Sequence, residues 1–106
     1  MQYELTEEQE TLRKSIRELA QGVIAPRAAE IDEKAEFPVD VWEQLAKYGW
    51  LSLVIPEEYG GTGAPVLTTC VVIEEISRVC ASSALILAVH SLGSTPINIA
   101  ATHEQK

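Results

Sequence analysis

The stretch IPEEYGGTGAPVL, which runs from Ile55 to Leu67, joins two segments whose apolar spacing is helical. Its backbone determinants are two prolines and three glycines, namely Pro56, Pro65, Gly60, Gly61 and Gly63. The first proline ends the preceding segment, the glycine pair at 60 and 61 permits positive φ, and the second proline begins the next helix. Tyr59 is the one large side chain that can pin the stretch to the rest of the molecule. We therefore predict an ordered loop that turns the chain between two helices.

Two helices are predicted in the first 35 residues. Thr6 and Gln9 have the spacing of a capping box, so the first helix begins there. Its apolar stripe consists of Leu12, Ile16, Leu19 and Val23. Pro26 suits a first helical turn, so a second helix is expected to begin near Ala25. The residues that face inward from this second helix are Ala28, Ile31 and Ala35.

A third helix is predicted between Pro38 and Gly49, because proline suits a first helical turn and glycine suits a helix end. Its apolar stripe consists of Val41, Trp42, Leu45 and Tyr48. After it, the apolar residues Leu51, Leu53 and Ile55 alternate with other side chains. This alternation predicts a short extended run that leads into the loop.

A fourth helix is predicted over residues 66–80, directly after the loop. Its apolar face consists of Val66, Cys70, Ile73 and Cys80, flanked by Val72, Ile76 and Val79. Glu74, Glu75 and Arg78 are expected on its solvent-exposed face, where Glu74 and Arg78 can form an i,i+4 ion pair. The uncharged sequence that follows predicts a fifth helix, capped by Ser82 or Ser83.

The fifth helix is expected to run through Leu92 and to stop at Gly93, and the Thr95-Pro96 pair begins a short sixth helix. The residues from Thr102 to Gln105 repeat the capping-box spacing, and the sequence stops one residue later. A helix start without its helix predicts a truncated chain. The alternative is a frayed polar tail that matches the motif by chance.

The composition is that of one globular domain. Of the 106 residues, 46% are hydrophobic and 23% are charged, which argues against disorder. The predicted fold is an all-α orthogonal bundle of about five to six helices in a single domain over residues 1–106, truncated at its C-terminal end. The net charge of −8 repels phosphate backbones and anionic lipids, so no nucleic-acid partner is expected.

No Asp, Glu, Lys or Arg occurs in residues 79–103. A membrane-spanning helix needs about 20 predominantly apolar residues, and serines, Gly93 and Pro96 interrupt the run here. We predict burial in protein and no membrane partner. The N-terminal sequence has neither the pattern of a secretory signal nor that of a transit peptide. The expected location is the cytoplasm of a bacterium, or the mitochondrial matrix for a mature eukaryotic chain.

Both cysteines are expected in a helix. Ten residues of helix place Cys70 and Cys80 about 15 Å apart, which is beyond the reach of a disulfide. We predict that both are reduced and buried, and the Cys and His spacings do not predict a zinc site. The acid pairs Glu57-Glu58 and Glu74-Glu75 are expected to be solvated, since neighbouring helical residues diverge.

Two further features suggest chemistry only weakly. His90 could act as a base, but a lone histidine beside Ser91 more often has a hydrogen-bonded structural role. The glycines of residues 60–63 resemble a phosphate loop, yet the required spacing and a basic residue are missing. Phosphate binding at this loop is therefore not expected.

Several motifs in a fixed order carry a family resemblance. IPEEYGGTG (residues 55–63), IEEISRVCAS (73–82) and HSLGSTPI (90–97) together resemble the N-terminal helical domain of the acyl-CoA dehydrogenases. The opening LTEEQETLRKSIRELAQGVIAPRAAEIDEKAEFP is similar to the first helices of that family, and HEQK to the start of its next helix. The resemblance covers essentially the whole chain, and it implies that a β domain and a second helical domain follow.

The resemblance implies a flavoenzyme that removes two hydrogens across the α and β carbons of an acyl-CoA thioester. In the family, a carboxylate base takes the α proton while a hydride leaves the β carbon for FAD. The family's flavin site and usual catalytic glutamate lie in the later domains, so no glutamate here is expected to be catalytic. The chain alone is expected to bind no FAD and to be inactive. Electron-transfer flavoprotein is the implied partner, and the full-length enzyme is expected to be a dimer or tetramer.

The resemblance leaves one role for residues of this chain, which is to wall the cavity for the acyl tail. The helix before the SLG motif lines the tail's end in the family, and here this maps to Ala84, Leu85, Ala88 and Leu92. Their i,i+3 and i,i+4 spacing places them on one face, and an apolar tail needs a wall without unpaired charge. For the same face, plain core is the alternative. For the whole chain, the alternative is a free-standing helical module that binds an apolar ligand or a partner.

Overall fold

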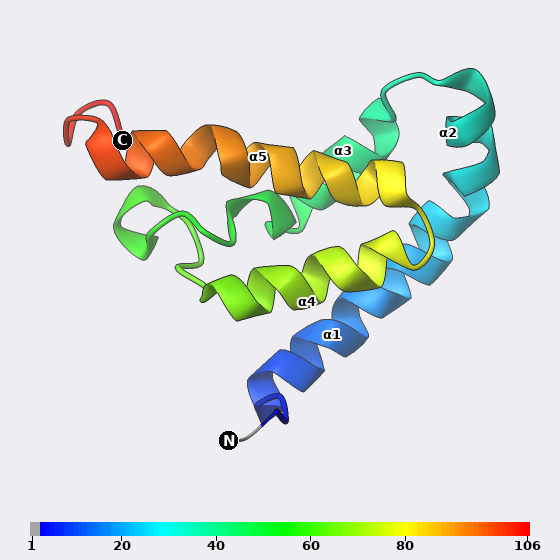
Figure 1. The fold of residues 1–106 in the computed structure, drawn as a ribbon, viewed down its shortest axis with the longest axis horizontal. Coiled ribbons are helices and arrows are strands. Elements are labelled where there is room, and N and C mark those ends of the chain that lie inside the picture. Colours follow the sequence, from blue (N-terminus) through cyan, green and yellow to red (C-terminus); the bar gives the residue numbers. More distant parts are fainter. Residues whose placement is uncertain (1–2) are drawn as a thin grey trace.

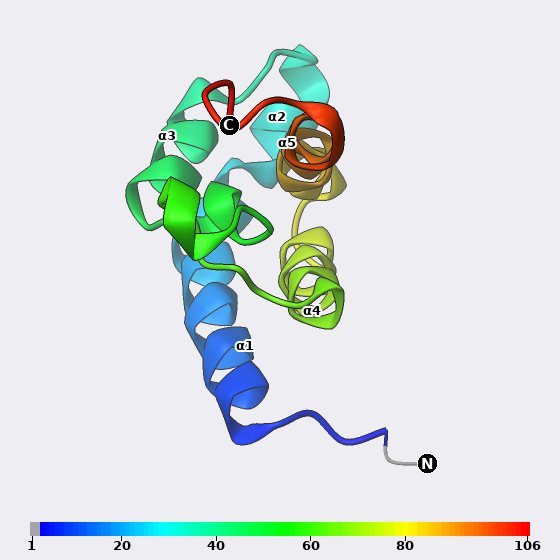
Figure 2. The ribbon, with the colours of Figure 1, turned by 90° about the vertical axis from the view of Figure 1, so that its left-hand side faces the viewer.

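The computed structural model describes residues 3–106, and every regular element in that range is helical (Figure 1). The α-helices are α1 (Glu7–Leu19), α2 (Ala28–Lys34), α3 (Val39–Lys47), α4 (Val66–Ser77) and α5 (Ala81–Ala100). α4 packs between α1 and α5, and α5 also contacts α3 (Figures 1 and 2). The predicted all-α fold class is confirmed.

α1 begins at the predicted capping box. The Thr6 hydroxyl accepts a hydrogen bond from the Gln9 backbone N–H at 3.2 Å, and the Gln9 side-chain oxygen accepts one from the Thr6 N–H at 3.0 Å. These two bonds satisfy donors that a helix start leaves without partners. Ile16 is the fully buried residue of α1.

A π-helix over Ala20–Ile24 follows α1 directly. The Ala25 N–H bonds to the carbonyl of Ala20, five residues earlier. The wider turn brings both ends of the π-helix, Ala20 and Ile24, into the core and leaves Val23 exposed. The prediction that Val23 belongs to the buried stripe is wrong, because it assumed 3.6 residues per turn throughout.

A 3₁₀ turn over Ala25–Arg27 leads into α2, so the second helical segment begins where Pro26 predicted. Ile31 is buried, as expected. Ala35 is exposed and ends α2 with a φ of 52°, in the left-handed region. Its predicted inward position is wrong, since the helix stops before that turn is complete.

α3 supplies two core residues, Val41 and Leu45, whereas Trp42 and Tyr48 of the predicted stripe are exposed. The helix ends before Gly49, whose φ of 78° favours glycine. A bidentate ion pair joins the start of α2 to α3, because the Arg27 guanidinium donates to both carboxylate oxygens of Asp40 at 2.7 and 3.0 Å.

The extended run that the sequence predicts before the loop is not present. Trp50–Ser52 forms a 3₁₀ turn and the chain continues through a turn to Ile55. Leu51 and Leu53 are both buried. Three alternating apolar residues are too short a pattern to distinguish an extended strand from a turn.

The loop is ordered by backbone hydrogen bonds, as predicted. The amides of Gly60, Gly61, Thr62 and Gly63 donate to the carbonyls of Glu57, Pro56, Ser52 and Ile55, at 3.0, 3.1, 3.0 and 2.8 Å respectively. Positive φ occurs at Gly60 and Gly63, and not at Gly61. Gly61 is required for a different reason, since a Cβ there would overlap the Ile55 carbonyl.

α4 turns a different face to the core from the predicted one. Val66 and Cys70 are exposed, whereas Val72 and Ile76 are fully buried. The buried face also includes Thr68, Thr69, Val71 and Glu75. Of the predicted flanking residues, Val72 and Ile76 are core residues and Val79 is half buried, while Cys80 of the predicted face is buried as expected. The pattern was ambiguous because apolar residues occur around most of this helix.

α5 is one continuous helix through Gly93 and Pro96, so the predicted stop and the sixth helix are wrong. Ala81 begins it, and the Cys80 side chain, not a serine, occupies the N-cap position without a capping bond. Side-chain hydroxyls bond to the helix backbone near Pro96. The hydroxyls of Ser91, Ser94 and Thr95 donate to main-chain carbonyls three or four residues earlier, at 2.7–3.3 Å.

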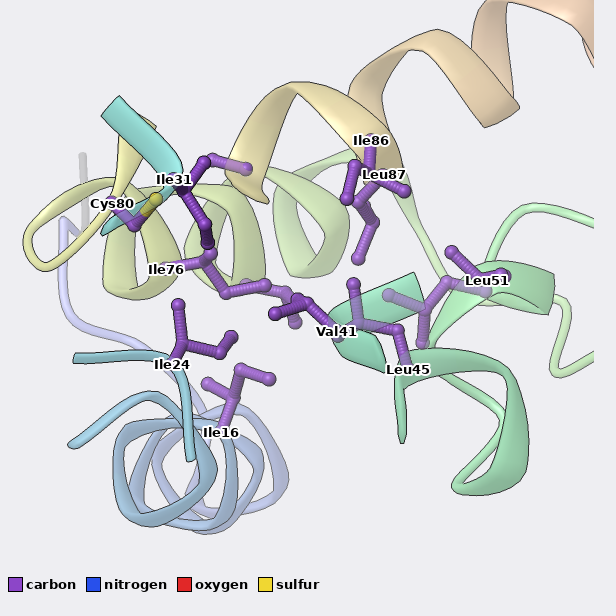
Figure 3. Close-up of a cluster of buried hydrophobic side chains, with 13 residues drawn as sticks. Ile16, Ile24, Ile31, Val41, Leu45, Leu51, Ile76, Cys80, Ile86 and Leu87 are labelled. Carbon is purple, nitrogen blue, oxygen red and sulfur yellow. The ribbon is translucent and has the colours of Figure 1, made fainter. Parts of the chain in front are cut away.

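The core lies where α1, α3, α4 and α5 meet (Figure 3). Ile16 and Ile24 face Ile76 of α4, while Leu87 of α5 points toward Val41 and Leu45 of α3 (Figure 3). All of these side chains are fully buried. One face of α5 thus packs in the core, and the rest of the helix circumference lies outside the core.

Candidate functional site

The exposed surface of α5 is the candidate site, because this helix is long, uncharged and only partly packed. Its buried side chains are Ser83, Ala84, Ile86 and Leu87. Large apolar residues outside that face remain exposed, namely Leu85, Val89, Leu92, Ile97 and Ile99. Among the described residues, α5 is also the one helix whose length and composition would allow it to cross a membrane, with a mean hydropathy of 1.3. Its predicted burial in protein holds for one face only.

The four residues predicted to wall an acyl tail do not share one environment. Ala84 is buried in the core, Ala88 is half buried, and Leu85 and Leu92 are 60% and 72% exposed. Ala84 belongs to the core cluster of this domain. Leu85, Ala88 and Leu92 form a strip on one flank of the helix, which we call the tail flank.

An apolar groove of about 640 Å³ lies along the adjacent flank of α5. α5 contributes Ser82, Leu85, Ile86, Val89 and His90 to it, and the other wall is Ile31, Ala35, Glu36, Phe37, Pro38 and Trp42. Leu85 is the one residue shared with the tail flank. The sequence analysis missed this groove, because its walls come from segments about 50 residues apart, and Ile31, Ala35 and Trp42 of the first segment were assigned to the core.

Glu75 was predicted to be solvated, yet it is 3% exposed and is the charged residue of the buried set. Arg17 donates to both its carboxylate oxygens, at 2.8 and 3.0 Å, and Arg13 and Arg78 donate at 3.2 and 3.3 Å. The hydrogen bonds from Arg17, then those from Arg13, lower the pKa of Glu75 from 4.5 to about 2, against the effect of burial. Arg78 forms its ion pair with Glu75 and not, as expected, with Glu74.

This carboxylate and its three arginines form an ion cluster that ties α4 to α1. Arg13 and Arg17 belong to α1, while Glu75 belongs to α4. The cluster lies away from the groove, and its carboxylate is held ionised by four donated hydrogen bonds. Such a group holds two helices together and is poorly suited to act as a general base.

Tyr59 pins the loop, as the sequence predicted. Its hydroxyl lies 2.7 Å from His103 Nδ1, and the two rings are 5.5 Å apart at their centroids. Partial desolvation, with a smaller effect of the Glu58 charge, raises the pKa of the Tyr59 hydroxyl. Beside this contact, Thr102 and Gln105 make the predicted reciprocal capping bonds, at 3.0 and 3.3 Å.

The remaining predictions from the sequence have different outcomes. Cys80 is buried, but Cys70 is exposed, so the prediction that both are buried is wrong. The imidazole of His90 is exposed at the groove and has no hydrogen bond within residues 3–106, so its expected hydrogen-bonded role is not observed. The loop amides at 60–63 are all bonded to main-chain carbonyls. They have no free donors for a phosphate, in agreement with the sequence analysis.

Comparison with known proteins decides the family. The family described as "Acyl-CoA dehydrogenase, N-terminal domain" matches residues 6–106. The chain belongs to this family. Among curated relatives of the acyl-CoA dehydrogenase domain, the probable acyl-CoA dehydrogenase FadE25 of Mycobacterium tuberculosis is 47% identical over 104 residues, covering 98% of this chain and 27% of that protein.

Two further relatives carry more specific names. The short-chain specific acyl-CoA dehydrogenase of Clostridium acetobutylicum is 41% identical, over 100% of this chain and 28% of that protein. The cyclohex-1-ene-1-carbonyl-CoA dehydrogenase of Syntrophus aciditrophicus is 50% identical, over 89% of this chain and 23% of that protein. This acyl-CoA dehydrogenase domain thus spans about a quarter of the length of the curated relatives it matches.

A solved structure supports the same assignment of fold. It comes from work on the electron transferring flavoprotein of Acidaminococcus fermentans and flavin-based electron bifurcation. The TM-score is 0.92 at 32% identity, covering 99% of this chain and 28% of that chain. The helical arrangement of this acyl-CoA dehydrogenase N-terminal domain is therefore the arrangement found in that chain.

Proposed function

We propose that this domain works within a flavin-dependent acyl-CoA dehydrogenase, an oxidoreductase that forms a double bond between the α and β carbons of an acyl-CoA thioester. The observation that carries the proposal is the uncharged, outward-facing tail flank of α5 in a domain of this family. Apolar side chains held on a rigid helix suit the wall of an acyl-chain cavity. The catalytic base is assigned to another part of the enzyme.

FAD is the proposed cofactor of the whole enzyme, where it would accept the hydride. The described residues of this chain do not fit a flavin site of their own. The loop amides at 60–63 are bonded to main-chain carbonyls, and the guanidiniums of Arg13 and Arg17 are engaged by Glu75. We therefore propose that the isolated chain binds no flavin. Recovery of the purified 106-residue chain with stoichiometric yellow FAD would contradict this.

The partners and location are proposals of the same kind. Electron-transfer flavoprotein is the proposed electron acceptor of the whole enzyme, which we propose to be a homodimer or homotetramer in the cytoplasm of a bacterium or in the mitochondrial matrix. Acyl-CoA is the proposed substrate. One relative is named for short-chain substrates and another for a cyclic acyl-CoA, so membership of the family does not identify the acyl group of the substrate.

The test of the tail flank is Ala88→Phe in the enzyme that contains this domain. Ala88 is the small residue between Leu85 and Leu92, so a phenyl ring there would fill space that a long tail needs. Each buried methylene contributes about 0.8 kcal/mol, so excluding two or three lowers kcat/KM for long acyl chains by about 10- to 100-fold. The assay is kcat/KM against a series of acyl-CoA lengths, and the shortest substrates should be nearly unaffected.

The matched control is Ala29→Phe, which introduces the same ring at an exposed position of α2. It should leave the chain-length profile unchanged. Melting temperatures of both variants detect overpacking. Equal loss at every chain length, or a lower melting temperature with an unchanged profile, would assign Ala88 to ordinary packing and refute the tail flank.

A further inference from the structure

We draw no further inference here: the strongest candidate, the apolar groove between α5 and the 31–42 segment, carries none, because nothing in the described residues 3–106 shows what covers this face in a chain that spans about a quarter of the length of its relatives.

Discussion

α4 and α5 lie side by side and are both rich in apolar residues, yet they relate to solvent in opposite ways. α4 carries an ionised carboxylate, Glu75, that is almost completely buried. α5 carries no Asp, Glu, Lys or Arg, and most of its large apolar side chains after Leu87 are exposed. The charged helix is anchored within the domain, and the uncharged helix faces outward.

The difference shows that charge and burial are separate properties of a helix. Glu75 is buried because three arginines supply the hydrogen bonds that water would otherwise make. The outer surface of α5 is uncharged although this domain does not bury it. An uncharged surface of this kind fits contact with another apolar surface, as the proposed tail flank requires.

The comparison predicts its largest difference in stability when an isoleucine is replaced by alanine on each helix in turn. Ile76→Ala on α4 removes a side chain that is 0% exposed, and it should lower the free energy of unfolding by about 3–4 kcal/mol. Ile99→Ala on α5 removes one that is 78% exposed and should change it by less than about 0.5 kcal/mol. Urea unfolding followed by circular dichroism measures both. Similar losses would show that α5 packs more tightly in solution than the structure indicates.

A smaller effect is expected at the ion cluster. Glu75→Gln removes the charge that compensates Arg13, Arg17 and Arg78, and we expect a loss of about 2 kcal/mol of unfolding free energy. The loss is smaller than the roughly 3–5 kcal/mol expected when a fully buried pair is broken, because the guanidiniums are partly exposed and water can solvate them. The neighbouring Glu74→Gln, at an exposed position, is the control and should be within about 0.5 kcal/mol of the parent. Equal effects would mean that the cluster does not hold α4.

The same carboxylate predicts how stability depends on pH. The folded-state pKa of Glu75 is about 2 and its ordinary value is 4.5, so folding favours the ionised form. Its contribution is fully present above about pH 4.5 and is lost as the pH falls toward 2. Unfolding free energy measured between these values should fall less steeply with acid in Glu75→Gln than in the parent chain. Parallel curves would contradict the assigned pKa.

The smallest predicted effect is a gain of stability on α5. Gly93 lies inside the helix with open space where a Cβ would be, so Gly93→Ala should stabilise the chain by about 0.5–1 kcal/mol. Gly49→Ala is the contrasting change, because a φ of 78° strains any L side chain, and it should destabilise the chain. Thermal melting compares the two. A destabilising Gly93→Ala would show that α5 needs flexibility at this position.

Local signals in the sequence predicted local structure well. The Thr6 capping box, the glycine at the end of α3 and the ordered loop all depend on residues within a few positions of one another. For the same reason Tyr59 could be identified as the residue that pins the loop. Its partner His103 could not, since 44 residues separate them.

The sequence failed where the outcome depended on distant partners. Glu75 resembles any surface acid until Arg13 and Arg17 arrive from α1, about 60 residues earlier. Gly93 and Pro96 resemble helix stops, but α5 continues through both to Ala100. The groove could not be predicted, because Trp42 matches a core stripe when α3 is considered alone and the other wall comes from α5, about 50 residues later.

The π-helix at Ala20–Ile24 has a consequence for insertions and deletions. A π turn holds about one residue more than an α turn over the same path, so this segment stores one residue that a regular helix would not need. Deleting Gly22 would therefore convert the turn to α geometry and leave the residues after it in their present register. Ile24 and Ile31 would stay in the core, whereas the same deletion in a regular helix would rotate everything after it by about 100°. The segment between Ile16 and Ile31 thus tolerates the loss of one residue that a regular helix does not.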